Sequence, residues 1–288
     1  IGAHVGTRPR LTWTAFMVTA AIVAGCGKGA APPEREPALH RAADIIAGAG
    51  PDFVFSNEAH GFAGSRHVSA CWLEALSARL DFTHFGAETF SGRGPVPSGG
   101  EDDLIARSGP YVRMAHFEDL LHGAGRNGLT FLAYDDRTIS QAGLDALGLS
   151  PSPFNRRAGA AARTLLAEVG PGERAFVHTG PGHPDRRYRA DRPGRRGWVG
   201  ALADRNAANG AVSIANHRTR FPAWVQDAAG PCPPGVTLDD AALLVDLEAD
   251  TLRCAARSAR PDHAPLFDVY TIDPRMGDGD GADAHLDH

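Results

Sequence analysis

The stretch Phe53-Val54-Phe55-Ser56-Asn57-Glu58-Ala59-His60 decides the fold class of this chain. It begins as an apolar run of strand length and ends on a carboxylate and an imidazole. Two later runs end in a similar way, at Ala87-Glu88-Thr89 and at Thr179-Gly180-Pro181-Gly182-His183. In an open α/β sheet, ligands bind at the carboxyl ends of the strands. We therefore expect a functional site at that edge of a sheet.

Around this stretch, short apolar runs alternate with stretches whose apolar residues recur at helical spacing. The predicted strands lie at 53–55, 82–88, 129–134, 174–179, 212–215, 242–247 and 267–272, and the predicted helices at 65–80, 114–125, 153–169 and 198–208. This alternation predicts an α/β fold, with a mostly parallel sheet flanked by helices on both faces and an irregular C-terminal part. Right-handed crossovers would bring the carboxyl ends of the strands to one edge.

The N-terminal residues have the pattern of a secretory signal. Arg8 and Arg10 precede an apolar run, residues 11–25, that is shorter than the roughly 20 residues needed to span a bilayer. Small residues then stand directly before Cys26, as in the bacterial lipobox, in which the cysteine is lipidated. Gly27 favours an outer-membrane lipoprotein that faces the periplasm. The alternative is an ordinary signal peptide that is cut near Ala24.

These features predict four regions. Residues 1–25 are a lipoprotein signal peptide, 26–44 a flexible tether, 45–272 a single α/β domain and 273–288 a disordered acidic tail. The membrane is then a partner through the lipid anchor. The formal net charge of −5 argues against nucleic acid as a partner.

The four cysteines show no CxxC spacing, so no cysteine zinc site is expected. In an oxidising compartment, Cys232 and Cys254 could pair. That pairing, with lipidation of Cys26, would leave Cys71 as a buried apolar residue within a helix.

The order of these motifs resembles the superfamily that contains the erythromycin esterases, the ChaN haem-binding lipoproteins and the Tiki/TraB proteases. Members read Gly-Glu-x-His after the first strand, and this chain reads Asn57-Glu58-Ala59-His60. Phe85-Gly86-Ala87-Glu88 resembles the second motif, and Gly180-Pro181-Gly182-His183 the later histidine motif. The likeness covers most of residues 53–220. Asn57 departs from the family glycine, which puts the turn that presents Glu58 and His60 in doubt.

The resemblance implies a hydrolase that directs water at an ester or amide carbonyl of a small-molecule or peptide substrate. In one version, His60 is the general base, Glu58 and Glu88 support it, and His183 polarises or protonates the substrate. In the other version, His60, Glu88 and His183 hold a divalent metal that lowers the pKa of bound water. The ChaN likeness instead implies a haem- or iron-binding lipoprotein, and Asn57 leaves open a family member without catalysis.

Other polar residues near the predicted edge have both a functional and a structural interpretation. Arg66 could bind a carboxylate or carbonyl oxygen of the substrate, or be a solvated helix residue. Tyr134 could line the cleft. Glu88 could form a structural salt bridge with an arginine, and His178, inside a strand, is more typical of a satisfied core histidine.

Overall fold

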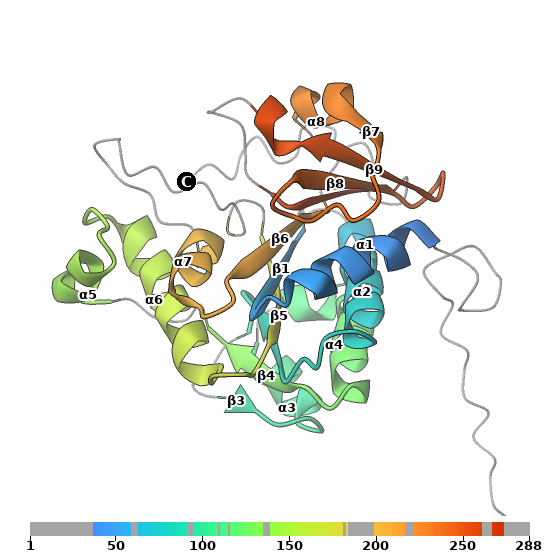
Figure 1. Cartoon of the computed structure of the whole chain (residues 1–288). Helices are drawn as coiled ribbons and strands as arrows, with labels where there is room; N and C mark the ends of the chain where they lie inside the picture. The colour runs from blue at the N-terminus through green and yellow to red at the C-terminus, as the bar shows by residue number, and fades with distance from the viewer. Residues whose placement is uncertain are drawn as a thin grey trace, which may run out of the picture.

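The computed structural model describes residues 37–58, 63–90, 95–108, 110–114, 116–134, 139–180, 183, 199–216, 222–260 and 267–273. Within these ranges the chain forms a ten-stranded sheet in the order β3-β4-β2-β5-β1-β6-β10-β8-β9-β7, with helices around it (Figure 1). The predicted α/β fold with a mostly parallel sheet is confirmed. His60 and Cys26 lie outside the described residues.

The strands are β1 (Phe53–Asn57), β2 (His84–Ala87), β3 (Pro95–Val96), β4 (Thr130–Ala133), β5 (Ala175–Thr179), β6 (Ala211–Ala215), β7 (Ala229–Pro231), β8 (Ala241–Asp246), β9 (Thr251–Ala256) and β10 (Val269–Ile272). The helices are α1 (Pro37–Ala49), α2 (Ala63–Ser77), α3 (Glu101–Arg107), α4 (Phe117–Arg126), α5 (Gln141–Ala146), α6 (Pro153–Glu168), α7 (Val199–Asn206) and α8 (Ala223–Ala228), with 3₁₀ turns at Pro110–Arg113 and Arg257–Ala259.

The parallel centre of the sheet has β1 in its middle. β1 pairs with β5 on one side and β6 on the other, and β2 lies between β5 and β4. β10 continues the parallel order from β6 to β8. Because neighbouring parallel strands run in the same direction, the carboxyl ends of β4, β2, β5, β1 and β6 reach a common edge, as predicted.

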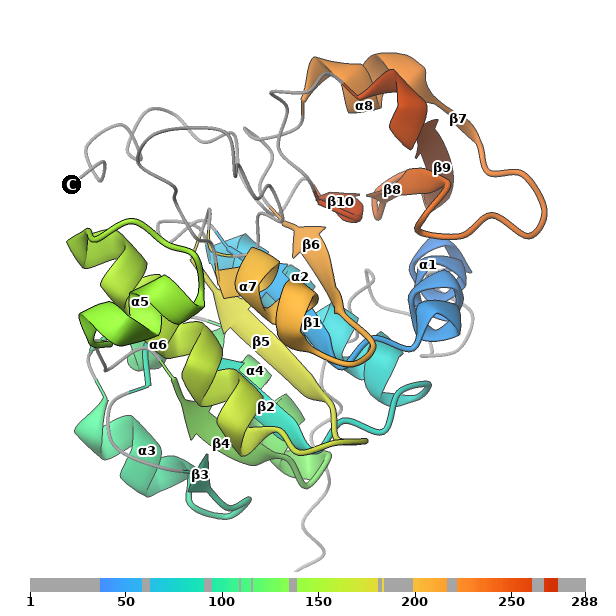
Figure 2. The same cartoon turned by 60° about the vertical axis from the view of Figure 1, so that its left-hand side comes forward.

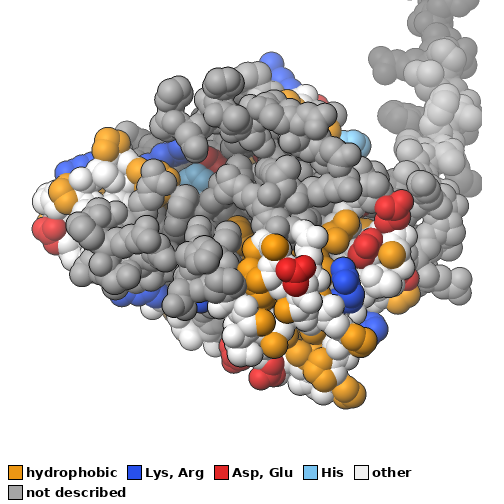
Figure 3. Space-filling model, turned by 90° about the horizontal axis from the view of Figure 1, so that it is seen from above, with side chains coloured by type: hydrophobic (Ala, Val, Ile, Leu, Met, Phe, Trp, Pro, Cys, Tyr) orange, Lys and Arg blue, Asp and Glu red, His pale blue; other side chains and the backbone are white. Residues whose placement is uncertain are grey.

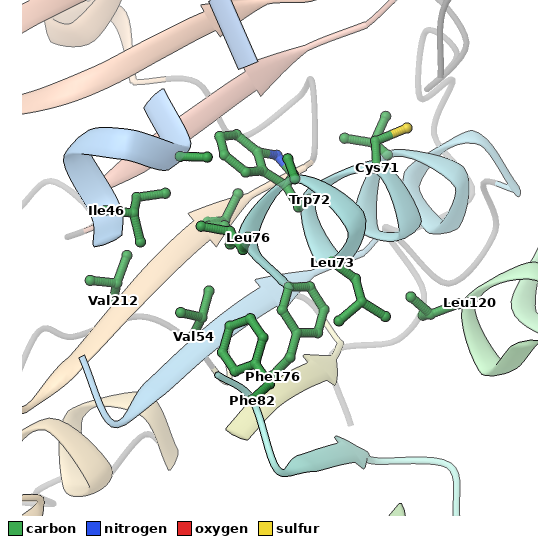
Figure 4. Close-up of a cluster of buried hydrophobic side chains, with 14 of the residues drawn as sticks. Ile46, Val54, Cys71, Trp72, Leu73, Leu76, Phe82, Leu120, Phe176 and Val212 are labelled. Carbon is green, nitrogen blue, oxygen red and sulfur yellow. The ribbon is translucent and has the colours of Figure 1, made fainter. Parts of the chain in front are cut away.

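Helices cover both faces of this centre, α2 and α4 on one and α6 and α7 on the other (Figure 2). The strands are apolar on both faces, as buried parallel strands are. Phe176 of β5 packs on the α2 side, and its neighbour Val177 packs on the α6 side. Trp72 and Leu76 of α2 lie over the strands in the first of these cores (Figure 4).

The C-terminal part adds an antiparallel extension. β8 and β9 form an antiparallel pair, and β7 pairs antiparallel with β9 at the edge. β9 and β7 were not predicted. Figure 3 shows the surface at the α8 end, where apolar side chains lie among scattered acidic and basic ones. The described part of this face therefore has no large patch of a single charge.

Two of the cysteine predictions have different outcomes. Cys232 and Cys254 form a disulfide, which joins the end of β7 to β9 as predicted. The prediction that Cys71 is a buried residue within a helix is confirmed, because it lies in α2 and is 1% exposed, but it is disulfide-bonded and is not left unpaired. The chain has one further cysteine, Cys26. Its predicted lipidation stays a prediction.

The N-terminal boundary of the folded part also needs correction. The predicted tether extends to residue 44, but α1 begins at Pro37. Leu39, Ala42, Ala43 and Ile46 of this helix are buried, and they recur at the i, i+3, i+4, i+7 spacing of an amphipathic helix. None of the helices in the described ranges combines the length and the apolar character that crossing a bilayer requires.

The burial of His84 predicts how the stability of the protein depends on pH. Burial lowers the pKa of His84, at the start of β2, below its ordinary value of 6.5, although Glu173 and Glu168 act in the opposite direction. The unfolded chain therefore binds a proton more readily than the folded one at this position. The free energy of unfolding is expected to fall as the pH decreases below 6.5 through the lowered pKa, and to be recovered as the pH rises.

Urea denaturation at a series of pH values from 7.5 downward measures this effect. His84→Gln is expected to make the acid-side decline shallower, whereas His122→Gln, at an exposed position in α4, keeps the decline of the wild type. An unchanged slope in His84→Gln would contradict the assignment.

Candidate functional site

Buried polar atoms without partners mark the carboxyl edge of the sheet. Among the described residues, ten buried side-chain nitrogen or oxygen atoms have no hydrogen-bond partner. Seven of them belong to residues at or just after the carboxyl ends of strands, or at the start of α2: Asn57 Nδ2, Ser65 Oγ, Thr89 Oγ1, His178 Nδ1, His178 Nε2, His183 Nδ1 and Asn216 Oδ1. Buried polar groups are normally satisfied, so this concentration points to a place built for a ligand or a reacting group.

Glu58 stands directly after β1, where its backbone N–H donates to the carbonyl of Thr179 at 3.0 Å. Its side chain is 1% exposed and lies between two cationic or potentially cationic groups. Arg66 Nη1 of α2 is 3.5 Å from Oε2, and His178 Nε2 of β5 is 3.2 Å from the same oxygen. The His178 contact is within ion-pair distance but is not aligned as a hydrogen bond.

Aromatic rings close this cluster on the α4 side. The guanidinium carbon of Arg66 lies 5.2 Å from the ring centroid of Tyr111, a cation–π distance. Phe117 stands edge-on to the His178 ring at 5.6 Å. Arg66 is 1% exposed, so the interpretation of a solvated helix residue is wrong, and its contact with a substrate stays a prediction.

Glu88 follows β2 and holds a second cluster. Its Oε2 accepts the N–H of Gly180 at 2.6 Å and the hydroxyl of Thr179 at 3.2 Å. Its Oε1 accepts from Arg157 Nη2 of α6 at 2.9 Å and lies 3.4 Å from His183 Nε2. The expected alternative of a salt bridge to an arginine is therefore present, together with the contact to His183. Hydrogen bonds to a carboxylate favour its ionised form, so the surroundings of Glu88 stabilise an anion.

The two clusters lie on opposite faces of the sheet. β5 separates them, because Glu58 and Glu88 donate backbone N–H groups to consecutive β5 carbonyls, those of Thr179 and His178. Side chains alternate along a strand, so Glu58 shares the face of Val54 and α2, while Glu88 is directed to α6. The structure thus brings together Glu58 with Arg66, and Glu88 with His183, but it does not merge the four into one cluster.

Exposure distinguishes the two clusters. The side chains of Glu58 and His178 are 1% and 2% exposed, whereas those of Glu88 and His183 are 12% and 13% exposed. The ring of Phe154 lies tilted against that of His183, with 6.4 Å between centroids. The Glu88–His183 pair is therefore the one that lies nearer to solvent.

Asn57, the departure from the family motif, has a structural role of its own. Its Oδ1 accepts the backbone N–H of Asn216 at 2.6 Å, which joins the ends of β1 and β6. The side chain of Asn216 donates to Ser56 Oγ at 2.7 Å. Asn57 does not have a positive φ, so the expected conflict with a left-handed turn at this residue does not arise.

Tyr134, predicted to line the cleft, is 1% exposed and packs inside the sheet edge. Its hydroxyl lies 3.5 Å from the carbonyl of His178. A Cβ at Gly86 would come within 3.2 Å of the Tyr134 ring, so the glycine of the second motif leaves room for this ring. Tyr134 supports the strand ends that carry His178 and Glu88.

The residues present do not favour the metal version of the mechanism. No group of three or more His, Cys, Asp or Glu side chains in the described ranges is arranged to hold a metal ion. Glu88 already receives N–H and O–H donors on both oxygens, one of them from a guanidinium, and a metal would have to compete with these groups. The third predicted ligand, His60, lies outside the described residues.

His178 differs in one respect from the satisfied core histidine that its position predicts. Its position inside an apolar strand favoured a satisfied core histidine, yet neither ring nitrogen has a hydrogen-bond partner in the described part of the chain. The available signal was a titratable residue in an otherwise apolar run, on the strand that ends in the later histidine motif.

Comparisons with known proteins give structural likeness alone. No family model and no curated protein matches the chain. Solved structures described as bacterial protein toxins are similar over 62% of this chain and 36% of their own, with 16% identity and a TM-score of 0.38. The RRSP effector domain of a Vibrio vulnificus MARTX toxin is similar over 61% of this chain and 35% of its own, with 18% identity and a TM-score of 0.37. The chain spans about a third of the length of these structures, and likeness at this level assigns it to no family.

Proposed function

We propose that this protein hydrolyses an ester or an amide, with His183 as the general base and Glu88 as the carboxylate that positions it. One observation carries the proposal: Nε2 of His183 faces Oε1 of Glu88 at 3.4 Å, while Nδ1 has no partner among the described residues. A histidine held by a carboxylate at one ring nitrogen has the other nitrogen available to accept a proton.

Each proton and bond has a place in this reaction. With its proton on Nε2 toward Glu88, neutral His183 accepts a proton from water at Nδ1 while the water oxygen attacks the carbonyl carbon. The imidazolium that forms is stabilised by the anionic Glu88. It then returns the proton to the leaving oxygen or nitrogen as the carbon–oxygen or carbon–nitrogen bond breaks. Nδ1 is buried, so water and substrate have to gain access to it before this step.

The partners of Glu88 are consistent with an orienting role. Gly180 N–H, Thr179 Oγ1 and Arg157 hold the carboxylate from three directions, so its Oε1 stays directed at His183. The Glu58–Arg66–His178 cluster is almost fully buried, and we assign it to holding the ends of β1 and β5 rather than to contact with substrate.

The test is hydrolysis by the full-length protein of two substrate series, p-nitrophenyl esters of short acids and peptide p-nitroanilides. We expect release of p-nitrophenol or p-nitroaniline above the buffer rate, unchanged after dialysis against a chelator. No release from either series at any pH between 6 and 9 would reject the proposal. Release that disappears with the chelator and returns with a divalent ion would replace it by the metal version.

A further inference from the structure

We propose a second binding site, at the opposite edge of the sheet from His183, for a small organic cation with an apolar portion, such as an aryl- or alkylammonium ion. The site is a cavity of about 820 Å³, within the range of about 300–1,000 Å³ that small-molecule pockets occupy. It is independent of the proposed hydrolytic site.

The cavity lies where the amino ends of the strands meet the C-terminal extension. Pro51 precedes β1, Ala211 and Val212 begin β6, and Asp268 precedes β10. The end of α1 and the segment 236–239 before β8 form its other walls. All of these segments belong to the described part of the chain.

Carboxylates dominate the charges that line the cavity. Four aspartates line it, Asp44, Asp204, Asp239 and Asp268, against one cationic side chain, Arg257, and Asp44 is paired with Arg79 Nε at 2.5 Å. Arg257 is bonded to the fully buried Asp268, whose Oδ2 also accepts the backbone N–H of Ser213 at 2.8 Å. The single arginine is therefore held by an aspartate of the same wall and is poorly placed to receive an anionic ligand.

Helix ends add to the negative potential. Gly48 and Ala49, the last residues of α1, line the cavity, and Asp204 lies in the last turn of α7. The C-terminus of a helix carries partial negative charge, so an aspartate is disfavoured there and a cation is favoured. Asp204 accepts the N–H of Ala211 at 2.9 Å, which fixes its carboxylate at the wall.

Apolar side chains supply the rest of the lining. Ile45, Val212, Val236 and Leu238 contribute hydrocarbon surface, and Val212 and Leu238 are 4% and 5% exposed. A fully hydrated metal ion would gain nothing from these side chains. An organic ammonium ion matches both parts of the lining, since its charge faces carboxylates and its hydrocarbon part covers aliphatic groups.

Calorimetric titration of the protein with three ligands of similar shape tests the preference for a cation. The ligands are cationic 2-phenylethylamine, neutral 2-phenylethanol and anionic 3-phenylpropionate. We expect saturable binding of the amine, binding of the alcohol that is at least about fivefold weaker, and no binding of the acid. Raising the salt concentration should reduce the preference for the amine. Equal binding of amine and alcohol, or no saturable binding of the amine, would overturn the proposal.

Variants locate the binding. Gly48 lines the cavity and a Cβ there would meet no atom within 4 Å, so Gly48→Phe fits without a clash and adds a ring at the cavity wall. Phenylalanine favours a helix more than glycine does, so the substitution should not unfold α1. A loss of binding in this variant would therefore reflect the filled space. Asp239→Asn is expected to weaken the amine about two- to fivefold, and Asp102→Asn, on distant α3, to leave it unchanged. Unaltered binding in Gly48→Phe would place the amine elsewhere and reject the site.

Discussion

Replacement of Arg66 by methionine is expected to lower the free energy of unfolding by about 3–5 kcal/mol. Arg66 and Glu58 are each 1% exposed, with 3.5 Å between Nη1 and Oε2. Removal of the guanidinium takes a permanently charged partner away from a carboxylate that is buried inside the protein. Such a group costs far more than the loss of a surface ion pair, because water cannot replace the missing partner.

Urea denaturation of Arg66→Met, of Glu58→Gln and of the double variant measures this effect. The double variant Arg66→Met/Glu58→Gln removes both charges and is expected to be less destabilised than the sum of the two single variants. Arg107→Met is the matched control, because Arg107 lies 3.8 Å from Asp103 on the exposed surface of α3 and should change stability by less than about 1 kcal/mol. A loss in Arg66→Met no larger than in Arg107→Met would contradict the structural role of the buried pair.

The second large effect concerns catalysis. His183→Gln is expected to reduce kcat/KM for whichever substrate series is hydrolysed by about 10²–10⁴-fold, since general-base catalysis typically contributes that much. Glu88→Gln should reduce it as well, because a neutral amide stabilises the imidazolium less than a carboxylate does. If the two residues act as one unit, the double variant is expected to be hardly slower than the worse single variant.

The exposed His122 in α4 provides the control for this series, and His122→Gln should retain wild-type kcat/KM. Circular dichroism and urea denaturation establish that each variant is folded. A folded His183→Gln protein with wild-type kcat/KM would remove His183 from the reaction. Full additivity of His183→Gln and Glu88→Gln would show that the two side chains act separately.

The sequence was sufficient to predict the class of fold and the edge that carries the site. Glu58 and Glu88 follow apolar runs of strand length, and both lie at the predicted edge. The sequence did not predict which face of the sheet each side chain lies on. The central strands are apolar on both faces, so their sequences show no alternation of polar and apolar residues. The separation of Glu58 from Glu88 also depends on β5 lying between β1 and β2, an order that no local pattern encodes.

The other differences have local causes. α1 was missed because its alanine-rich sequence follows a Gly/Ala/Pro stretch, although Leu39 and Ile46 fit a helical stripe. β9 was missed because Arg253 and Thr251 interrupt its apolar character, while its pairing with β8 and β7 stabilises it. In each case contacts with distant segments outweighed local composition.

The central position of β1 has a consequence for how the chain reaches its native state. Both neighbours of β1 arrive late in the sequence, since Phe53 pairs with Ala175 in β5 and with Ala211 in β6. Contacts of such wide sequence separation slow folding, because long loops have to close before the pairing stabilises them. During synthesis, the apolar strand Phe53–Asn57 therefore has no native partner until more than a hundred further residues have left the ribosome. A chaperone that shields this segment would act in the interval when aggregation competes most strongly with folding.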